Sequence, residues 1–65
     1  SYVIEFKYTK NRNEIETLSN QAIEQIKENH YDIDLSGEVI YIGLSHCGKD
    51  VSIKWEDRIE ELERE

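Results

Sequence analysis

Apolar and polar side chains alternate over residues 2–8, which predicts a β-strand at the start of the chain. The two-residue period of a strand places successive side chains on opposite faces. We expect the face that contains Tyr2, Ile4 and Phe6 to pack on a core, because it is the more apolar of the two. The two sets are Tyr2, Ile4, Phe6 and Tyr8 on one face, and Val3, Glu5 and Lys7 on the other.

The pattern changes to a helical period after the polar loop formed by residues 9–12. Asn13 is the predicted N-cap of this helix, and Glu16, three residues later, is the predicted second member of a capping box. We expect the helix to end near Asn29 or His30. Its apolar stripe consists of Ile15, Leu18, Ala22, Ile23 and Ile26.

Two further strands are predicted in the second half of the chain. Residues 38–45 are strongly apolar, which is typical of a strand that is covered on both faces. Residues 50–55 alternate again, and residues 46–49 between the two runs predict the turn of a hairpin. Residues 56–65 hold six acidic and two basic residues and predict a helix with a thin apolar stripe.

The predicted order is therefore strand, helix, strand, strand, helix. The first two strands are separated by a long connection that contains a helix, which predicts a right-handed crossover between parallel strands. The hairpin adds the third strand in antiparallel orientation. We expect an α/β fold with a small mixed sheet and β-α-β-β-α order, in which residues 1–65 form a single small domain or the C-terminal fragment of a larger one.

Composition narrows the class of protein further. The chain has 65 residues, of which 37% are hydrophobic and 35% are charged, and its net charge is −7. This length excludes a multi-domain enzyme, and no apolar run is long enough to span a membrane. The single cysteine excludes an internal disulfide and favours a reducing compartment, so we expect a cytoplasmic protein. The negative charge argues against a free-standing nucleic-acid binder, because phosphate binding needs a basic surface.

Glu5 and Lys7 are the residues whose pattern indicates a chemical mechanism. They are two positions apart on a strand, so both side chains leave the same face, roughly 6.6–6.8 Å apart along it. A carboxylate at Glu5 is able to bind Mg²⁺. An ammonium at Lys7 is able to orient a water molecule or to neutralise charge that develops on a phosphate. Such a pair is also common on solvated strand faces, where it has no catalytic role.

Several short segments around this pair, taken together, resemble a known family. They are residues 2–8 (YVIEFKY), 21–27 (QAIEQIK), Tyr31, 39–45 (VIYIGLS), Gly48-Lys49 and Trp55-Glu56. This string, which covers residues 2–56, resembles the C-terminal part of the PD-(D/E)XK nuclease superfamily and its restriction-endonuclease-like core. It is most similar to the bacterial and archaeal branch in which the nuclease domain often follows an AAA-ATPase-like domain in the chain.

The resemblance implies a phosphodiester hydrolase that uses Mg²⁺ or Mn²⁺. It implies that Glu5 binds the metal and that Lys7 assists the attacking water. It also implies that Gln25 on the following helix lies against the site, with Tyr31 as a looser match. On a helical wheel Gln25 borders the apolar stripe, whereas Gln21 lies one turn back and further from the core. A solvated helix edge remains the alternative for Gln25.

The superfamily's metal-binding Asp, on a strand before Glu-x-Lys, has no counterpart here, because only residues 1–4 precede Glu5. The other Asp candidates, Asp32, Asp34 and Asp50, follow the motif and lie in predicted loops or turns. We therefore expect the chain to be inactive as it stands. Its nucleic-acid partner would then bind the full-length parent, and the rest of the nuclease core, or another protein, would pair along the exposed first strand.

Other interpretations of the candidate residues carry less weight. His30, His46 and Cys47 match no zinc spacing, and the adjacent pair His46-Cys47 lacks a third group that would orient it as a nucleophile. Trp55 and the tyrosines are able to stack on bases but are expected in the core.

The alternative function is a non-enzymatic protein-interaction module built on a remnant of the same fold. A small acidic regulator in which Glu5 and Lys7 are only a surface pair is the third hypothesis.

Overall fold

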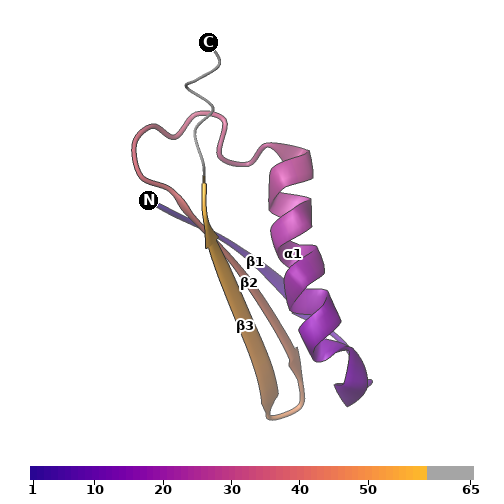
Figure 1. Cartoon of the computed structure of the whole chain (residues 1–65). Coiled ribbons are helices and arrows are strands. Elements are labelled where there is room, and N and C mark those ends of the chain that lie inside the picture. Colours follow the sequence, from indigo (N-terminus) through magenta and orange to yellow (C-terminus); the bar gives the residue numbers. More distant parts are fainter. Residues whose placement is uncertain (59–65) are drawn as a thin grey trace.

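The computed structural model describes residues 1–58. It contains β1 (Tyr2–Tyr8), a short 3-10 turn η1 (Arg12–Glu14), α1 (Ile15–Asn29), β2 (Ile40–Cys47) and β3 (Asp50–Asp57). The single long helix lies against one face of the sheet (Figure 1). No helix within the described residues is long and apolar enough to cross a membrane.

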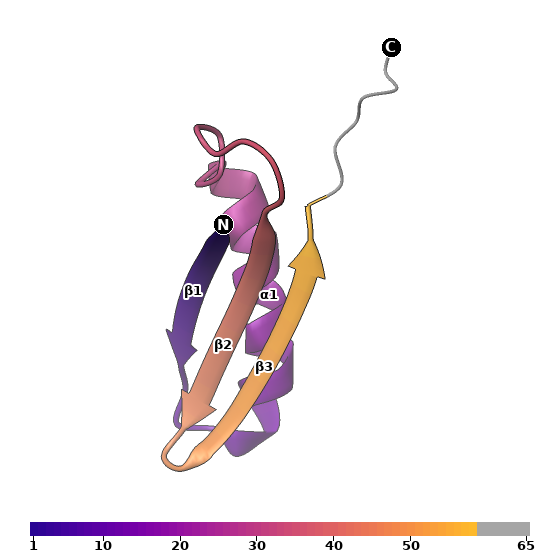
Figure 2. The ribbon, with the colours of Figure 1, turned by 90° about the vertical axis from the view of Figure 1, so that its left-hand side faces the viewer.

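The three strands form one mixed sheet in the order β1-β2-β3, shown face-on in Figure 2. β1 and β2 are parallel, with Tyr2 opposite Ile40, and β2 and β3 are antiparallel, with Ile40 opposite Asp57. The helix connects the two parallel strands, as a parallel crossover requires. The predicted α/β class and the mixed sheet are therefore confirmed. The predicted C-terminal helix lies largely in residues 59–65, outside the described residues.

Both strands of the hairpin end later than the sequence pattern predicted. β2 runs through His46 and Cys47, so the turn is the two residues Gly48 and Lys49. Gly48 has a φ of +60°, a conformation that two-residue hairpin turns need and that glycine adopts without strain. β3 continues to Asp57, so residues 56–57 belong to this strand and not to the predicted acidic helix. The prediction was wrong here because antiparallel pairing to β2 outweighs the weak β propensity of the acidic residues.

The start of α1 also differs from the prediction. Asn13 lies inside the 3-10 turn, and its backbone N–H donates to the side chain of Asn11 at 3.0 Å. This cap at Asn11 begins the turn before Asn13, so the predicted capping box with Glu16 does not form and α1 begins at Ile15. The predicted end is confirmed, since α1 ends at Asn29 and His30 follows with a left-handed φ of 55°.

The core lies between α1 and the central strand. Ile23 and Ile26 of the helix pack with Val39 and Tyr41, and Val3 and Leu35 pack against this cluster. The helix approaches β2 closely at Gly43, where a β-carbon would overlap the backbone oxygen of Ser19 and meet the Ala22 Cβ at 3.0 Å. Small residues on the helix-facing side of β2 therefore allow the close packing.

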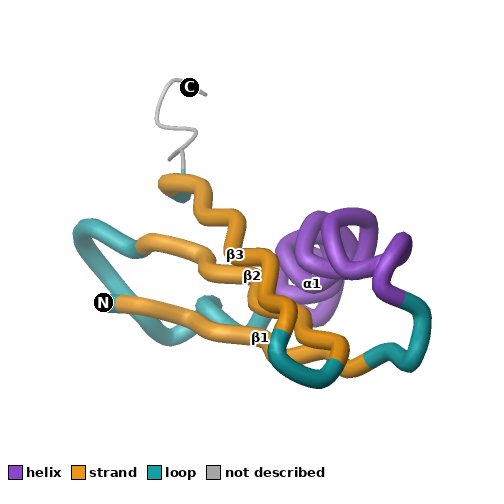
Figure 3. The backbone as a smooth tube through the Cα atoms, turned by 90° about the horizontal axis from the view of Figure 1, so that it is seen from below, coloured by secondary structure: helices purple, strands orange, loops and turns teal. Residues whose placement is uncertain are grey.

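The helix covers the face of β1 opposite to the one that the sequence pattern favoured. Phe6 is 65% exposed, and Tyr2 and Ile4 are exposed as well. Trp55 on β3 is 71% exposed, so its expected place in the core is also wrong. Figure 3 shows α1 on one side of the three strands. The alternation predicted the strand correctly but not its covered face, because the small residues of β2 decide where the helix can approach.

Candidate functional site

Glu5 and Lys7 lie on the helix-facing side of β1. In the parallel register Glu5 is opposite Gly43 and Lys7 is opposite Ser45, two residues buried beneath α1. The side chains of Glu5 and Lys7 are 24% and 26% exposed, and Glu5 Oε2 lies 3.9 Å from Lys7 Nζ. The two charged groups therefore form a pair at the junction of helix and sheet that water can still reach.

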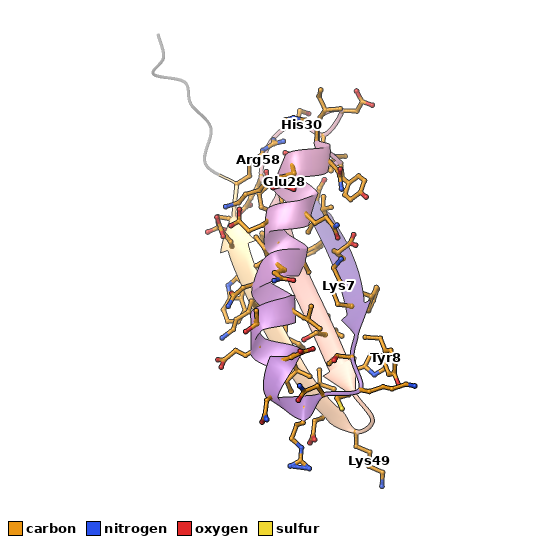
Figure 4. All side chains as sticks on the ribbon, turned by 90° about the vertical axis from the view of Figure 1, so that its right-hand side faces the viewer. Lys7, Tyr8, Glu28, His30, Lys49 and Arg58 are labelled. Carbon is orange, nitrogen blue, oxygen red and sulfur yellow. The ribbon has the colours of Figure 1, made fainter. Side chains whose placement is uncertain are left out.

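Gln25 joins this pair from the helix. Lys7 Nζ donates a hydrogen bond to Gln25 Oε1, although the two residues are 18 positions apart. Figure 4 shows Lys7 on β1, beside α1. Gln25 is half-buried, whereas Gln21 is exposed, as the helical wheel predicted. The contact determines the direction of the ammonium, because an amide oxygen that accepts one of its protons restricts the rotation of a long side chain.

This arrangement has a definite chemical capacity. A lysine ammonium has three N–H donors, and one of them donates its hydrogen bond to Gln25. The remaining donors are able to hold a water molecule or a phosphate oxygen near the Glu5 carboxylate. The face opposite α1 takes no part in this site, because Glu5 and Lys7 both point toward the helix side of the sheet.

The described residues do not fit a self-contained divalent-metal site. No three His, Cys, Asp or Glu side chains stand together in residues 1–58. The site holds the carboxylate of Glu5 and the ammonium of Lys7, whereas Mg²⁺ is usually held by one or two carboxylates and carries no cation as a ligand. The predicted role of Glu5 as a metal ligand therefore stays a prediction.

None of the other Asp candidates joins the site in the described structure. Asp32 binds Arg58, and Asp50 forms an ion pair with Arg12 at 2.7 Å. Asp34 is exposed in the connection between α1 and β2. These three carboxylates lie in loops or at a strand end, as expected from the sequence.

The remaining candidates are also separate from Glu5 and Lys7. Tyr31 is 54% exposed, and its hydroxyl accepts a hydrogen bond from Asn29 Nδ2 at 3.2 Å rather than contacting Lys7. His46 packs its ring on Tyr8, with ring centres 5.1 Å apart. Cys47 is a half-buried free thiol at the end of β2. His30 caps α1, so none of these side chains forms a metal cluster with its described neighbours.

A second polar cluster, which the sequence pattern did not indicate, lies at the opposite end of the sheet. Arg58 Nη1 donates to Asp32 Oδ2 at 3.0 Å and to the backbone oxygen of Leu35 at 3.1 Å, and Nη2 donates to the backbone oxygen of Gly37 at 3.0 Å. The Tyr41 hydroxyl donates to Asp32 Oδ2 at 2.8 Å. The cluster ties the connection after α1 to the end of β3.

Two pKa shifts follow from this cluster. The hydrogen bond from Arg58 lowers the pKa of Asp32, against the opposing effect of burial. Burial raises the pKa of Tyr41 to about 12, and its hydrogen bond to Asp32 adds to the shift. Both shifts favour an ionised carboxylate that accepts from a neutral phenol, so the cluster has a structural role. Its members are too distant in the sequence for local periodicity to connect them.

Comparison with known families agrees with the resemblance seen in the sequence. The model of the PD-(D/E)XK nuclease superfamily matches residues 1–56, which include β1, α1, β2 and all of β3 except Asp57. No curated protein and no solved structure matches the chain. The match covers most of the chain, and the protein belongs to the PD-(D/E)XK nuclease superfamily.

Proposed function

We propose that this chain is the part of a metal-dependent nuclease domain that carries the Glu-x-Lys strand, in a protein that hydrolyses phosphodiester bonds of nucleic acid. The observation that carries the proposal is the placement of Glu5 and Lys7 on the helix-facing side of β1, with Lys7 bonded to Gln25. A surface ion pair would need no such partner from the helix. Membership of the superfamily supports the same reaction.

Each of the three residues has a distinct proposed role. The Lys7 ammonium donates a hydrogen bond that orients the attacking water, or that neutralises charge developing on a phosphate oxygen. Gln25 is a positioning residue, because it acts on the reaction only through the direction of the Lys7 ammonium. Glu5 supplies one carboxylate to Mg²⁺ or Mn²⁺, and the other ligands come from outside residues 1–58.

The second part of the proposal is that residues 1–65 are a C-terminal fragment and are inactive alone. β1 is at the edge of the sheet, so within residues 1–58 its outer side has no partner strand. A strand from the rest of the domain, paired there, would bring a second carboxylate to the side of Glu5. We propose that the parent protein is in the cytoplasm and that an AAA-ATPase-like domain precedes this chain in it. The free thiol of Cys47 supports a reducing compartment.

Manganese titration followed by NMR tests the role of Glu5. At millimolar Mn²⁺ we expect the amide signals of Glu5 and of its neighbour across the sheet, Gly43, to broaden first. Glu5→Gln should abolish this selectivity, whereas the control Glu24→Gln, at an exposed helix position, should preserve it. Broadening spread evenly over the acidic residues would contradict the metal-binding role of Glu5.

An activity assay tests the fragment. With Mg²⁺ or Mn²⁺ present, we expect the 65-residue chain to leave labelled DNA and RNA, single- and double-stranded, intact. Cleavage that Lys7→Met abolishes, with the fold preserved by circular dichroism, would support the nuclease reaction and contradict the inactivity of the fragment. Cleavage that survives Lys7→Met would contradict the assigned role of Lys7.

A non-enzymatic interaction module is the second candidate function, and the unpaired edge of β1 is the observation that favours it. An exposed strand edge is a template for pairing with another chain. Under this hypothesis Lys7→Met and Gln25→Ala should leave partner binding unchanged. Phe6→Pro should abolish it, because the backbone N–H of Phe6 points away from β2, to the outer edge of β1. Loss of function on changing Lys7 alone would favour the nuclease.

A further inference from the structure

Two lysines differ from every other basic residue in the described part of the chain. Within residues 1–58, neither Lys10 nor Lys49 forms an ion pair with a carboxylate. Every other basic residue in this range does form one. Lys10 and Lys49 are also exposed, so both ammonium groups are available to an anion from outside the described residues. The paired basic residues are Lys7, Arg12, Lys27, Lys54 and Arg58.

Both lysines lie at the end of the sheet where the hairpin turns. This hairpin end consists of residues 8–13, from the last residue of β1 into η1, and of residues 46–50 around the turn. The backbone N–H of Thr9 donates to the backbone oxygen of His46 at 3.0 Å, and Arg12 Nε lies 2.7 Å from Asp50 Oδ2. These contacts hold the two segments side by side, so Lys10 and Lys49 belong to one surface.

The hairpin end is the basic part of an acidic chain. It contains three basic residues and one acidic residue, whereas the rest of residues 1–58 contains four basic and ten acidic residues. A polyanion is therefore repelled by most of the described surface and attracted at this end. The net charge of −7 does not exclude contact with nucleic acid here, because the charge is unevenly distributed.

We propose that the hairpin end binds the phosphate backbone of the nucleic acid whose scissile phosphate lies at Lys7. This inference rests on the proposed nuclease function and adds a second point of contact to it. Lys10 follows Lys7 by three positions, so their Cα atoms are at most about 10 Å apart. A nucleic-acid strand advances about 3.4 Å per nucleotide, which places Lys10 within about three nucleotides of the phosphate at Lys7.

The direction of the bound strand follows from the positions of these lysines. Figure 4 shows Lys7, Tyr8 and Lys49 in this order toward the hairpin end. Glu28 and His30 lie at the other end of the molecule (Figure 4). The strand therefore runs from the Glu5–Lys7 site toward the hairpin turn and not toward the end of α1. A lysine ammonium acts on a phosphate as a point charge, so the contact is independent of base sequence.

NMR titration of the full 65-residue chain with a short oligonucleotide, as a single strand and as a duplex, tests the proposal. No metal is added, so cleavage does not contribute. We expect the amide signals of Lys10 and Lys49 to shift together with that of Lys7. The signals of Glu28 and His30 should stay unchanged. Lys10→Gln and Lys49→Gln should each weaken binding several-fold and lower the slope of log affinity against log salt by about 1.

Lys54→Gln is the matched control. It removes the same charge from β3, where Lys54 pairs with Glu16, and should leave binding nearly unchanged. Gly48 adopts the positive φ of the hairpin turn, so Lys49→Gln does not strain the turn, and the remaining amide signals verify the fold of each variant. Equal weakening by all three variants would overturn the proposal, because net charge alone would then explain the binding.

Other outcomes separate this inference from the proposed nuclease function. Shifts confined to Glu5, Lys7 and Gln25 would overturn binding at the hairpin end and would still support the nuclease site. Equal shifts with inorganic phosphate, at the same phosphate concentration, would replace the backbone by a single anion. Absence of any shift at low salt would also overturn the inference, whereas the manganese titration at Glu5 tests the metal site independently. Loss of binding in a chain extended upstream of Ser1 would instead assign the two lysines to acidic residues of the rest of the polypeptide.

Discussion

The two faces of the sheet differ in a way that inverts the usual expectation. The face under α1 contains Glu5, Lys7, Gly43 and Ser45, whereas the opposite face contains the aromatic residues of β1 and β3. The helix packs where the central strand has small residues, since these allow the backbones to approach closely. Close packing against one strand therefore decides which face is covered, even when the other face offers more apolar area.

The flanking strands complete the covered face with polar contacts. Lys54 pairs with Glu16 at 3.1 Å, and Lys7 binds Gln25. A hydrogen bond from Lys27 to Glu56 raises the pKa of Lys27. The helix is thus held by an apolar centre on β2 and by charged side chains along both of its sides. A charged pair beside α1 is what the proposed nuclease site requires.

The largest effect is expected at Gly43, the point of closest approach. Gly43→Ala places a methyl group against the backbone oxygen of Ser19, so the helix must move away from the sheet. We expect a loss of about 3 kcal/mol in the free energy of unfolding, at the upper end of overpacking effects. Urea denaturation measures it, with Ser36→Ala in the exposed connection as control. A loss below about 1 kcal/mol would contradict the importance of the close approach.

Asp32→Ala tests the polar cluster beside the covered face. The change leaves Arg58 Nη1 and the Tyr41 hydroxyl without their carboxylate acceptor, which should cost about 2 kcal/mol at pH 7. The Arg58 hydrogen bond lowers the pKa of Asp32 below its ordinary 3.8, so its contribution is present above that pH and is lost as the pH falls through the folded value. Urea denaturation at pH 7 and pH 3 should therefore show a smaller difference between wild type and variant at pH 3.

Tyr41 is expected to titrate above the ordinary pKa of a tyrosine side chain. Its pKa of about 12 exceeds the ordinary 10.0, so the folded state favours the neutral phenol. This contribution to stability is present below pH 10 and is lost as the pH rises through 12. Absorbance of tyrosinate should show a late step that disappears in Tyr41→Phe, a variant that costs about 1 kcal/mol at neutral pH. The absence of a late step that Tyr41→Phe removes would contradict the burial of Tyr41.

The smallest effect is expected at Gln25. Gln25→Ala removes the acceptor of the Lys7 hydrogen bond, and the half-exposed position limits the loss of stability to about 0.5 kcal/mol. Gln21→Ala, one turn away on the exposed helix surface, is the matched control. In the parent nuclease Gln25→Ala should lower kcat more than it raises KM, because it alters the direction of the ammonium and not the binding of nucleic acid. Equal effects of the two variants would contradict a positioning role.

Local periodicity in the sequence determined the elements of this protein. The alternation over residues 2–8 predicted β1 with its bounds and placed Glu5 and Lys7 on one face. The helical spacing predicted the end of α1 and the border position of Gln25. The long helical connection between the first two strands predicted that they are parallel. Each of these properties depends on residues that are neighbours along the chain.

Only the tertiary structure decided which face of β1 is covered, and it left Phe6 and Trp55 exposed. It also brought Gln25 to Lys7 and Arg58 to Asp32, pairs separated by 18 and 26 positions. Strand pairing carried β2 to Cys47 and β3 to Asp57, beyond the bounds that composition indicated. The physical reason is that the approach of α1 depends on the absence of a side chain at Gly43, far along the chain from both β1 and the helix.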